Sequence, residues 1–128
     1  IGSNFILKQL SIGKNRILNY DKLTYAGNLG NLTTIEDNPN YKFVHGDICD
    51  KNKLNITIRK FKPDTIVHFA AESHVDRSID GPMDFIETNI VGTTTLLETA
   101  LRYWKKLSNS TFKFLLENIL IYFLKSLI

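Results

Sequence analysis

The stretch IVHFAAESHVDRS, residues 66–78, changes character at its middle. Its first half is a run of apolar, β-branched and aromatic residues, which is typical of a strand that is covered on both faces. Its second half is crowded with acidic, basic and hydroxyl side chains. In open α/β sheets, ligands bind beyond the carboxyl ends of the strands. The stretch therefore predicts a buried parallel strand that delivers polar groups to a ligand crevice.

Strand and helix patterns alternate along the rest of the chain. Nearly continuous apolar runs predict strands at 16–20, 41–45, 64–71 and 112–116. Apolar residues at helical spacing predict helices at 4–10, 51–62 and 82–106. Gly92 falls inside the last of these helices, where it costs about 1 kcal/mol against Ala and so indicates close packing. The alternation predicts a doubly wound α/β fold with a parallel sheet.

Composition excludes several classes of protein. The 128 residues are enough for one domain, and a hydrophobic content of 43% is ordinary for a globular protein. The excess of basic residues lies in 101–128, which carry five Lys/Arg and one Glu, so it does not indicate a nucleic-acid face. The single cysteine, Cys49, fits a reducing, cytoplasmic compartment. We expect no metal site, no signal peptide and no membrane span.

Two strand ends carry carboxylates that could bind a dinucleotide. Asp21 could accept hydrogen bonds from ribose hydroxyls and repel a 2′-phosphate, which would favour NAD over NADP; a solvated turn aspartate is an equal alternative. Asp47 could accept from the adenine amine, but a helix N-cap is the simpler interpretation, and Asp50 competes for that position. Residues 1–3, Ile-Gly-Ser, lie about twenty residues before Asp21 and could end a glycine-rich phosphate loop.

The third strand end is the second half of the opening stretch. Residues 69–73 would form a ledge under the nicotinamide ribose, because the small Ala70 and Ala71 permit close approach. A tight turn after a core strand is the alternative. The polar residues at 74–77 could supply a catalytic group, or they could equally form a loop whose side chains pair with one another.

Four segments together resemble the dTDP-glucose 4,6-dehydratases, extended short-chain dehydrogenase/reductases that act on nucleotide sugars. The segments are DKLTYAGN (21–28), GDICD (46–50), AAESHVDRSI (70–79) and FIETNIVGT (85–93). The resemblance implies a partial NAD-binding domain over 1–116, followed by a non-family apolar tail over 117–128. It implies a Rossmann-like doubly wound parallel sheet that is incomplete, with the family's first strand missing before Ile1 and its C-terminal half absent.

The resemblance also implies a reaction. The family is an NAD-dependent lyase that oxidises the glucose C4 hydroxyl of dTDP-glucose, eliminates water across C5 and C6, and returns the hydride to C6. It implies a homodimer for the full-length protein. Two alternatives stay open, namely a non-catalytic NAD- or nucleotide-binding remnant or interaction module, and a fragment of another nucleotide-sugar enzyme such as an epimerase. The HVDRS stretch argues against the epimerase.

The resemblance assigns cofactor-binding residues by position. Residues 21–24 would hold the adenosine side, 47 and 48 would flank the adenine, and 69–73 would line the nicotinamide side. Ser73 would also face the sugar substrate. The complete set is Ile1, Gly2, Asp21, Lys22, Leu23, Thr24, Asp47, Ile48, Phe69, Ala70, Ala71, Glu72, Ser73 and Thr88.

The chain departs from the family in its catalytic residues and its ends. None of its five tyrosines is followed four positions on by Lys, so no catalytic residue is assigned and the chain is predicted to be inactive. Residues 117–128 resemble nothing in the family, as after a frameshift or at a damaged gene end. The missing strand is expected to open the middle of the sheet. The tail is predicted to be a strand to about Leu116 and then a helix or a loosely packed apolar segment that touches no crevice ligand.

Overall fold

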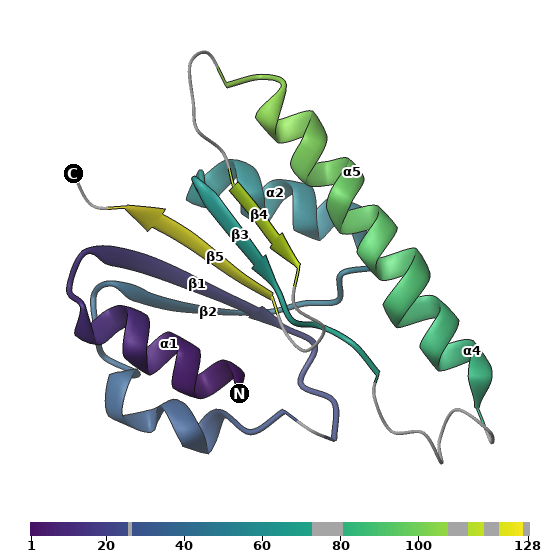
Figure 1. Cartoon of the computed structure of the whole chain (residues 1–128). Helices are drawn as coiled ribbons and strands as arrows, with labels where there is room; N and C mark the ends of the chain where they lie inside the picture. Colours follow the sequence, from purple (N-terminus) through teal and green to yellow (C-terminus); the bar gives the residue numbers. More distant parts are fainter. Residues whose placement is uncertain (26, 73–80, 108–112, 117–120, 127–128) are drawn as a thin grey trace.

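The computed structural model describes residues 1–25, 27–72, 81–107, 113–116 and 121–126. Helical and strand elements alternate over most of the chain (Figure 1). In chain order they are α1 (Gly2–Ser11), β1 (Asn15–Asp21), the 3₁₀ helix η1 (Leu29–Ile35), β2 (Tyr41–His45), α2 (Lys51–Phe61), β3 (Thr65–His68), α4 (Pro82–Phe85), the π-helix η2 (Ile86–Gly92), α5 (Thr93–Trp104), β4 (Lys113–Leu116) and β5 (Ile121–Ser126).

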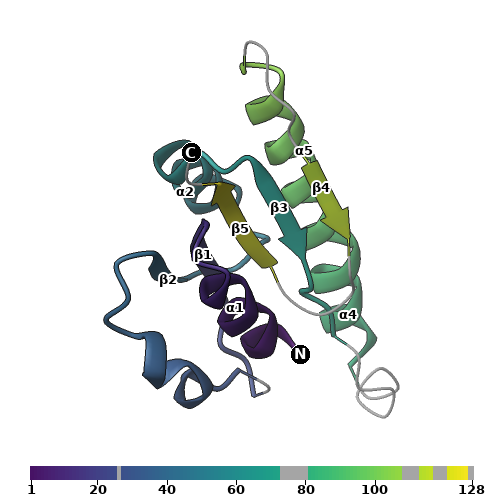
Figure 2. The ribbon, with the colours of Figure 1, turned by 60° about the vertical axis from the view of Figure 1, so that its left-hand side comes forward.

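The strands form one sheet in the order β2-β1-β5-β3-β4. β1 pairs with β2 and β3 pairs with β4, and both pairs are parallel, as expected for strands joined by helices. β5 lies between β1 and β3 and is antiparallel to both (Figure 2). The doubly wound α/β fold predicted from the sequence is confirmed, with one antiparallel strand added at its centre.

Two apolar cores cover the two faces of the sheet, because successive side chains of a strand point to opposite sides. Leu18 and Tyr20 of β1 belong to the core beneath α2 and α5. Ile17 belongs to the core beneath α1 and η1, with Ile6 and Leu32. Figure 1 shows α1 and η1 on one side of the sheet and α2 and α5 on the other.

Helix α2 shows how local sequence sets an element. Asp50 is its N-cap, and the side-chain Oδ1 accepts a hydrogen bond from the backbone N–H of Lys53 at 3.0 Å. Leu54, Ile58 and Phe61 are buried on one face, as their spacing predicts. The helix ends where Lys62 adopts a left-handed conformation with φ of 55° directly before a proline.

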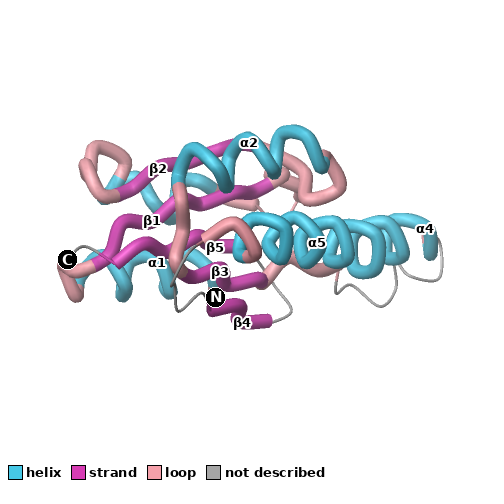
Figure 3. The backbone as a smooth tube through the Cα atoms, turned by 90° about the horizontal axis from the view of Figure 1, so that it is seen from above, coloured by secondary structure: helices cyan, strands magenta, loops and turns pink. Residues whose placement is uncertain are grey.

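The predicted long helix at 82–106 is present as one continuous rod that contains a π-helical turn (Figure 3). The π turn, Ile86–Gly92, was not predicted; such turns occur frequently at functional sites. A Cβ on Gly92 would lie 2.5 Å from Cδ1 of Ile48 and 3.2 Å from Sγ of Cys49. The close packing predicted for Gly92 is therefore confirmed.

A buried histidine ties β3 to this rod. His68 is 2% exposed, and its Nε2 lies 2.9 Å from Oγ1 of Thr93. Its Nδ1 is buried with no hydrogen-bond partner among the described residues. Burial lowers the pKa of His68 to about 4, because the interior disfavours the charged form. The imidazole is therefore neutral at physiological pH.

The C-terminal region corrects one prediction and confirms another. A strand to about Leu116 is present as β4, but the described part of the segment after it is not helical. Ile121–Ser126 is a strand, and it fills the middle of the sheet that was expected to be open. Helical spacing was the wrong signal, because two unpaired strand edges offer a hydrogen-bonded ladder that an isolated helix cannot match. Within the described residues, no helix has the length and apolar character needed to cross a membrane.

Candidate functional site

A cavity of about 280 Å³ opens at the carboxyl ends of β1 and β3, beside the first turn of α1. Its walls come from three places, namely the start of the chain, the segment after β1, and the segment after β3. The lining residues are Ile1, Gly2, Ser3, Asn19, Tyr20, Asp21, Lys22, Leu23, Thr24, Tyr25, Gly27, Asn28, Leu29, Asn31, Leu32, Asp47, Ile48, Ala70, Ala71, Glu72 and Thr88. The strand ends meet where an open α/β sheet places its ligand crevice.

Asp21 is fixed at the end of β1 by its own turn. Its Oδ1 accepts a hydrogen bond from the backbone N–H of Leu23 at 2.8 Å, and its backbone carbonyl accepts from the N–H of Gly46 at 2.9 Å. Leu23 takes a left-handed conformation with φ of 52°, which is uncommon for a non-glycine residue. No described residue is paired with Oδ2 of Asp21, so one carboxylate oxygen remains available at the cavity wall.

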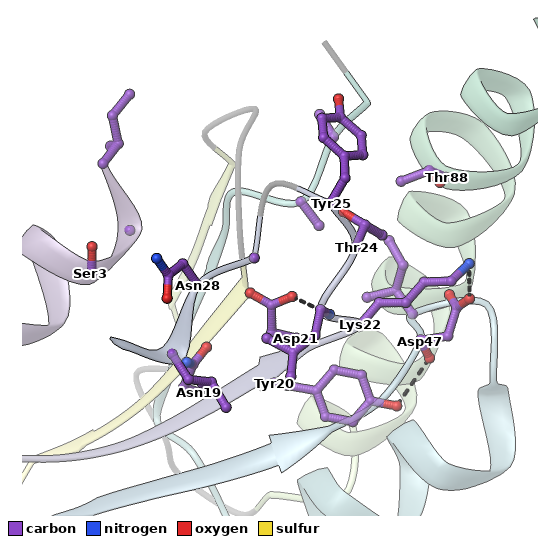
Figure 4. A pocket seen from close by; sticks show the side chains of 18 of the residues that line it. Ser3, Asn19, Tyr20, Asp21, Lys22, Thr24, Tyr25, Asn28, Asp47 and Thr88 are labelled. Atoms are coloured by element: carbon purple, nitrogen blue, oxygen red, sulfur yellow. Dashed lines mark hydrogen bonds and ion pairs between the residues drawn. The ribbon is translucent and has the colours of Figure 1, made fainter. Parts of the chain in front are cut away.

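Lys22 and Asp47 form an ion pair on the same wall (Figure 4). Nζ of Lys22 lies 2.6 Å from Oδ2 of Asp47, and Oδ1 of Asp47 accepts from the backbone N–H of Cys49 at 2.8 Å. Partial burial acts to raise the pKa of Asp47, but the hydrogen bonds from Lys22 and Cys49 outweigh it and hold that pKa below its usual value. The hydrogen bond to Asp47 raises the pKa of Lys22. Both groups are therefore charged at neutral pH.

The contacts of Asp47 bear on its predicted role. Asp50, and not Asp47, is the N-cap of α2, so that alternative does not hold. Each oxygen of Asp47 is already paired inside the chain, which leaves less capacity to accept from an adenine amine. Tyr20 also donates from its hydroxyl to the backbone carbonyl of Asp47 at 3.0 Å. Burial raises the pKa of this phenol, so it stays a donor.

The segment after β3 is held by an asparagine clamp. Oδ1 of Asn89 accepts from the backbone N–H of Glu72 at 2.8 Å, and Nδ2 of Asn89 donates to the carbonyl of Glu72 at 3.0 Å. Asn89 and Thr88 both lie in the π turn, so this turn brings Asn89 to the clamp and the preceding residue, Thr88, to the cavity. The segment Ala70–Glu72 is thereby fixed against the helical rod.

The structure gathers most of the predicted cofactor residues around this single cavity. Twelve of the fourteen line it, and the two exceptions are Phe69 and Ser73. Phe69 is 4% exposed and packs in the α1-side core, where its ring centroid lies 5.3 Å from that of Phe5. Ser73 lies outside the described residues, as do the polar residues 74–77 of the opening stretch.

Sequence reasoning missed the lining residues on the α1 side of the cavity, above all Asn19 and Asn28. Asn28 is the N-cap of η1 and accepts from the N–H of Gly30 at 2.8 Å. Asn19 is 3% exposed; its Nδ2 donates to the hydroxyl of Tyr41 at 3.2 Å, and its Oδ1 has no partner among the described residues. The signal that could have found it is a lone polar residue inside the apolar strand RILNY.

A sequence comparison decides the family. The profile described as GDP-mannose 4,6 dehydratase matches residues 1–116. The chain belongs to this family. It is 56% identical over 108 residues to a dTDP-glucose 4,6-dehydratase from Escherichia coli, a match that covers 84% of this chain and 30% of the relative. The resemblance drawn from the four segments is therefore confirmed. The chain spans about 30% of the length of the curated relatives it matches.

Solved structures of this family share the fold. A dTDP-glucose 4,6-dehydratase from Streptomyces venezuelae, solved with NAD bound, has a TM-score of 0.75 and 45% identity, and the match covers 80% of this chain and 33% of that chain. A UDP-glucose 4-epimerase from Thermotoga maritima has a TM-score of 0.69 and 28% identity over 80% of this chain and 31% of that chain. The identity is higher to the dehydratase than to the epimerase.

Proposed function

We propose that the cavity holds the adenosine half of NAD, with the ribose hydroxyls donating to Asp21. The observation that carries this proposal is the Asp21 carboxylate, which is fixed through Oδ1 and has Oδ2 available in a cavity that the first turn of α1 also lines. A carboxylate accepts from both hydroxyls of a ribose but repels a 2′-phosphate. The N-terminus of α1 carries unpaired N–H groups that favour the pyrophosphate.

The remaining predicted residues take supporting roles in this proposal. Leu23 and Ile48 offer apolar surface to the adenine, and Lys22 and Asp47 close the wall through their ion pair. Ala70, Ala71 and Glu72 extend the site toward the nicotinamide side, together with Thr88. Under this proposal residues 1–116 are the partial NAD-binding domain, which agrees with the extent of the family match, and residues 117–128 lie beyond it.

The test of this site is a comparison of NAD and NADP binding by calorimetry. Asp21→Asn keeps the side-chain oxygen that accepts from Leu23 while it removes the negative charge. The variant therefore measures how much the charge of Asp21 contributes to the choice between NAD and NADP. We expect the parent chain to prefer NAD and Asp21→Asn to lose most of that preference. Asp37→Asn, a charge change at an exposed position away from the cavity, serves as the control. An unchanged NAD/NADP ratio in Asp21→Asn would refute the ribose assignment.

We propose that the whole protein to which this sequence corresponds dehydrates dTDP-glucose to dTDP-4-keto-6-deoxyglucose. The support is the 56% identity to a dTDP-glucose 4,6-dehydratase over the matched region. The 128 residues alone are proposed to lack that activity, because they contain no Tyr-x-x-x-Lys pair. Positioned acid and base groups contribute about 10²–10⁴-fold each. Formation of the 4-keto product from dTDP-glucose and NAD by the purified chain would contradict this.

A second copy of the chain is the proposed partner of the helical rod. Ile86, Ile90, Leu97, Leu101 and Trp104 follow helical spacing, and each is between 43% and 60% exposed. Such a stripe is expected to be covered in an assembly. Analytical ultracentrifugation should show a dimer that Leu97→Glu dissociates, whereas Lys105→Glu, an exposed charge change, should not. A monomeric parent chain at high concentration would refute the pairing.

The free thiol of Cys49 supports a cytoplasmic location.

A further inference from the structure

The first residues after β1 are tied to the end of β2 by three contacts. The parallel ladder ends at the register pair Asp21 and His45, and directly beyond it the N–H of Gly46 donates to the carbonyl of Asp21 at 2.9 Å. Nε2 of His45 lies 2.9 Å from the carbonyl oxygen of Lys22. Nζ of Lys22 in turn lies 2.6 Å from Oδ2 of Asp47 (Figure 4). Lys22 is therefore held at its carbonyl and at its ammonium by residues of one short segment, 45–47.

The hydrogen bond of His45 has one possible direction. A carbonyl oxygen only accepts, so Nε2 carries the hydrogen and donates it to Lys22. His45 is exposed and belongs to neither of the two apolar cores. His45 therefore contributes to this part of the fold through the hydrogen bond, and not through burial of apolar area.

One peptide group connects His45 to the carboxylate of Asp21. The carbonyl of Lys22 and the N–H of Leu23 belong to the same planar trans peptide, so they point in opposite directions. His45 holds the carbonyl end of this peptide, and the N–H end donates to Oδ1 of Asp21 at 2.8 Å. The orientation of the peptide therefore decides whether the carboxylate is held.

The conformation of Leu23 shows that this orientation has to be held in place. Its φ is 52°, in the left-handed region that a non-glycine side chain disfavours. A flip of the peptide between Lys22 and Leu23 would bring this φ back to a negative value, as in the change from a type II to a type I turn. The flip would relieve Leu23, but it would turn the carbonyl away from His45 and the N–H away from Asp21.

We propose that His45 is a positioning residue for the ligand cavity. Its hydrogen bond holds the peptide between Lys22 and Leu23 against the flip, and the peptide fixes the Asp21 carboxylate with Oδ2 available at the cavity wall. His45 does not itself line the cavity, so it acts through Asp21 and not on the ligand. The inference rests on the proposed function, in which Asp21 accepts from the ribose hydroxyls.

The first experiment measures amide hydrogen exchange by NMR without a ligand. His45→Leu removes the donor, whereas His45→Gln keeps an N–H donor at about the place of Nε2. The Leu23 amide should exchange about two- to tenfold faster in His45→Leu, as for the loss of one hydrogen bond, and at the parent rate in His45→Gln. Lys42→Leu, the same replacement at another exposed residue of β2, is the control and should leave Leu23 unchanged.

The amide of Leu18, within the ladder of β1, reports whether the sheet is intact, and its exchange should stay at the parent rate in every variant. Leu23 exchange at the parent rate in His45→Leu overturns the inference. Equal acceleration at Leu18 and Leu23 also overturns it, because His45 would then stabilise the sheet as a whole. Fast Leu23 exchange in His45→Gln overturns it too, because the donated hydrogen bond would then not be what holds the peptide.

The second experiment compares the binding of ADP and 2′,3′-dideoxy-ADP by calorimetry. The ratio of the two Kd values measures what the ribose hydroxyls contribute to affinity. His45→Leu should lower this ratio about two- to tenfold and leave the Kd of the dideoxy nucleotide unchanged, and His45→Gln should keep the parent ratio. A parent ratio that persists in His45→Leu overturns the inference and leaves the ribose site standing. A ratio of one in the parent chain would instead refute the proposed role of Asp21, and this inference with it.

Discussion

Substitution of Gly46 by Ala tests how β2 and β1 are fitted together at the cavity wall. A Cβ at this position would lie 2.3 Å from Cζ of Tyr20, 2.5 Å from its hydroxyl oxygen and 2.6 Å from Cε2. Ordinary contact begins near 3.4 Å, so the ring would have to retreat by about 1 Å. Tyr20 is 1% exposed and donates to the carbonyl of Asp47, so a retreat of the ring would strain or break that hydrogen bond.

The expected cost follows from these contacts. Overpacking a buried site costs about 1–3 kcal/mol. Loss of the hydrogen bond from Tyr20 to Asp47 adds about 1 kcal/mol, which is the typical net contribution of one intramolecular hydrogen bond. Gly46→Ala should therefore lower the free energy of unfolding by about 2–4 kcal/mol. A displaced Asp47 would also loosen its ion pair with Lys22.

The assay is a double-mutant cycle with urea unfolding followed by circular dichroism. In a Tyr20→Leu background the ring is gone, so adding Gly46→Ala should cost less than about 0.5 kcal/mol. If Gly46→Ala alone does not fold, folding of the double variant carries the result. Equal destabilisation by Gly46→Ala in both backgrounds would refute the steric argument, because the effect would then not pass through the ring.

Three further predictions follow from other contacts. Burial keeps the folded-state pKa of His68 at about 4, below the value of about 6.5 in the unfolded chain. The contribution of neutral His68 to the free energy of unfolding is therefore complete above pH 6.5, and it falls by about 3 kcal/mol as the pH drops from 6.5 through 4. His68→Gln should flatten that part of the pH–stability curve. Asn89→Asp should cost about 1–3 kcal/mol and speed exchange of the Glu72 amide less than Asn89→Ala does, because the aspartate keeps the acceptor. Lys125 is the register partner of Arg16, and like charges at directly opposed positions of two strands are destabilising. Lys125→Glu should therefore stabilise the fold by about 0.2–1 kcal/mol, measured by thermal unfolding.

Each of these predictions has a contrary outcome. An unchanged acid limb in His68→Gln would show that another group titrates there. Equal Glu72 exchange in the aspartate and alanine variants would show that the accepted hydrogen bond does not hold that segment. Lys8→Glu is the matched charge change for Lys125→Glu, because it also replaces one lysine by a glutamate. Equal gains from the two would show that net charge, and not strand pairing, is responsible.

The elements that were predicted correctly are those whose bounds are set by residues close together in the sequence. The strand at 41–45 and the helix from Lys51 appear with nearly the expected bounds, because apolar spacing, the Asp50 cap and the following proline act over short distances. Gly92 was also predictable, since a glycine within a helix indicates a close neighbour.

Long-range pairing could not be predicted in the same way. The run after Leu116 fits both a buried strand and a helix, and only the unpaired edges of β1 and β3 decide between them. The π turn that holds Asn89 and Thr88 leaves no mark in the apolar spacing. For the site, the strand ends at Asp21 and Asp47 were predictable from topology, whereas the pairing of Asp47 with Lys22 depends on side-chain geometry.

The place of β5 in chain order has a consequence for how the protein is made. Asn15 pairs with Ser126, so the central ladder closes a loop that spans nearly the whole chain. Contacts of such long sequence separation slow folding, and β5 is translated after every strand it joins. The edges of β1 and β3 that β5 covers are templates for association with other chains as long as β5 is not in place. Yield in the cell should therefore depend on how quickly synthesis reaches β5, and on chaperones that shield those edges until then.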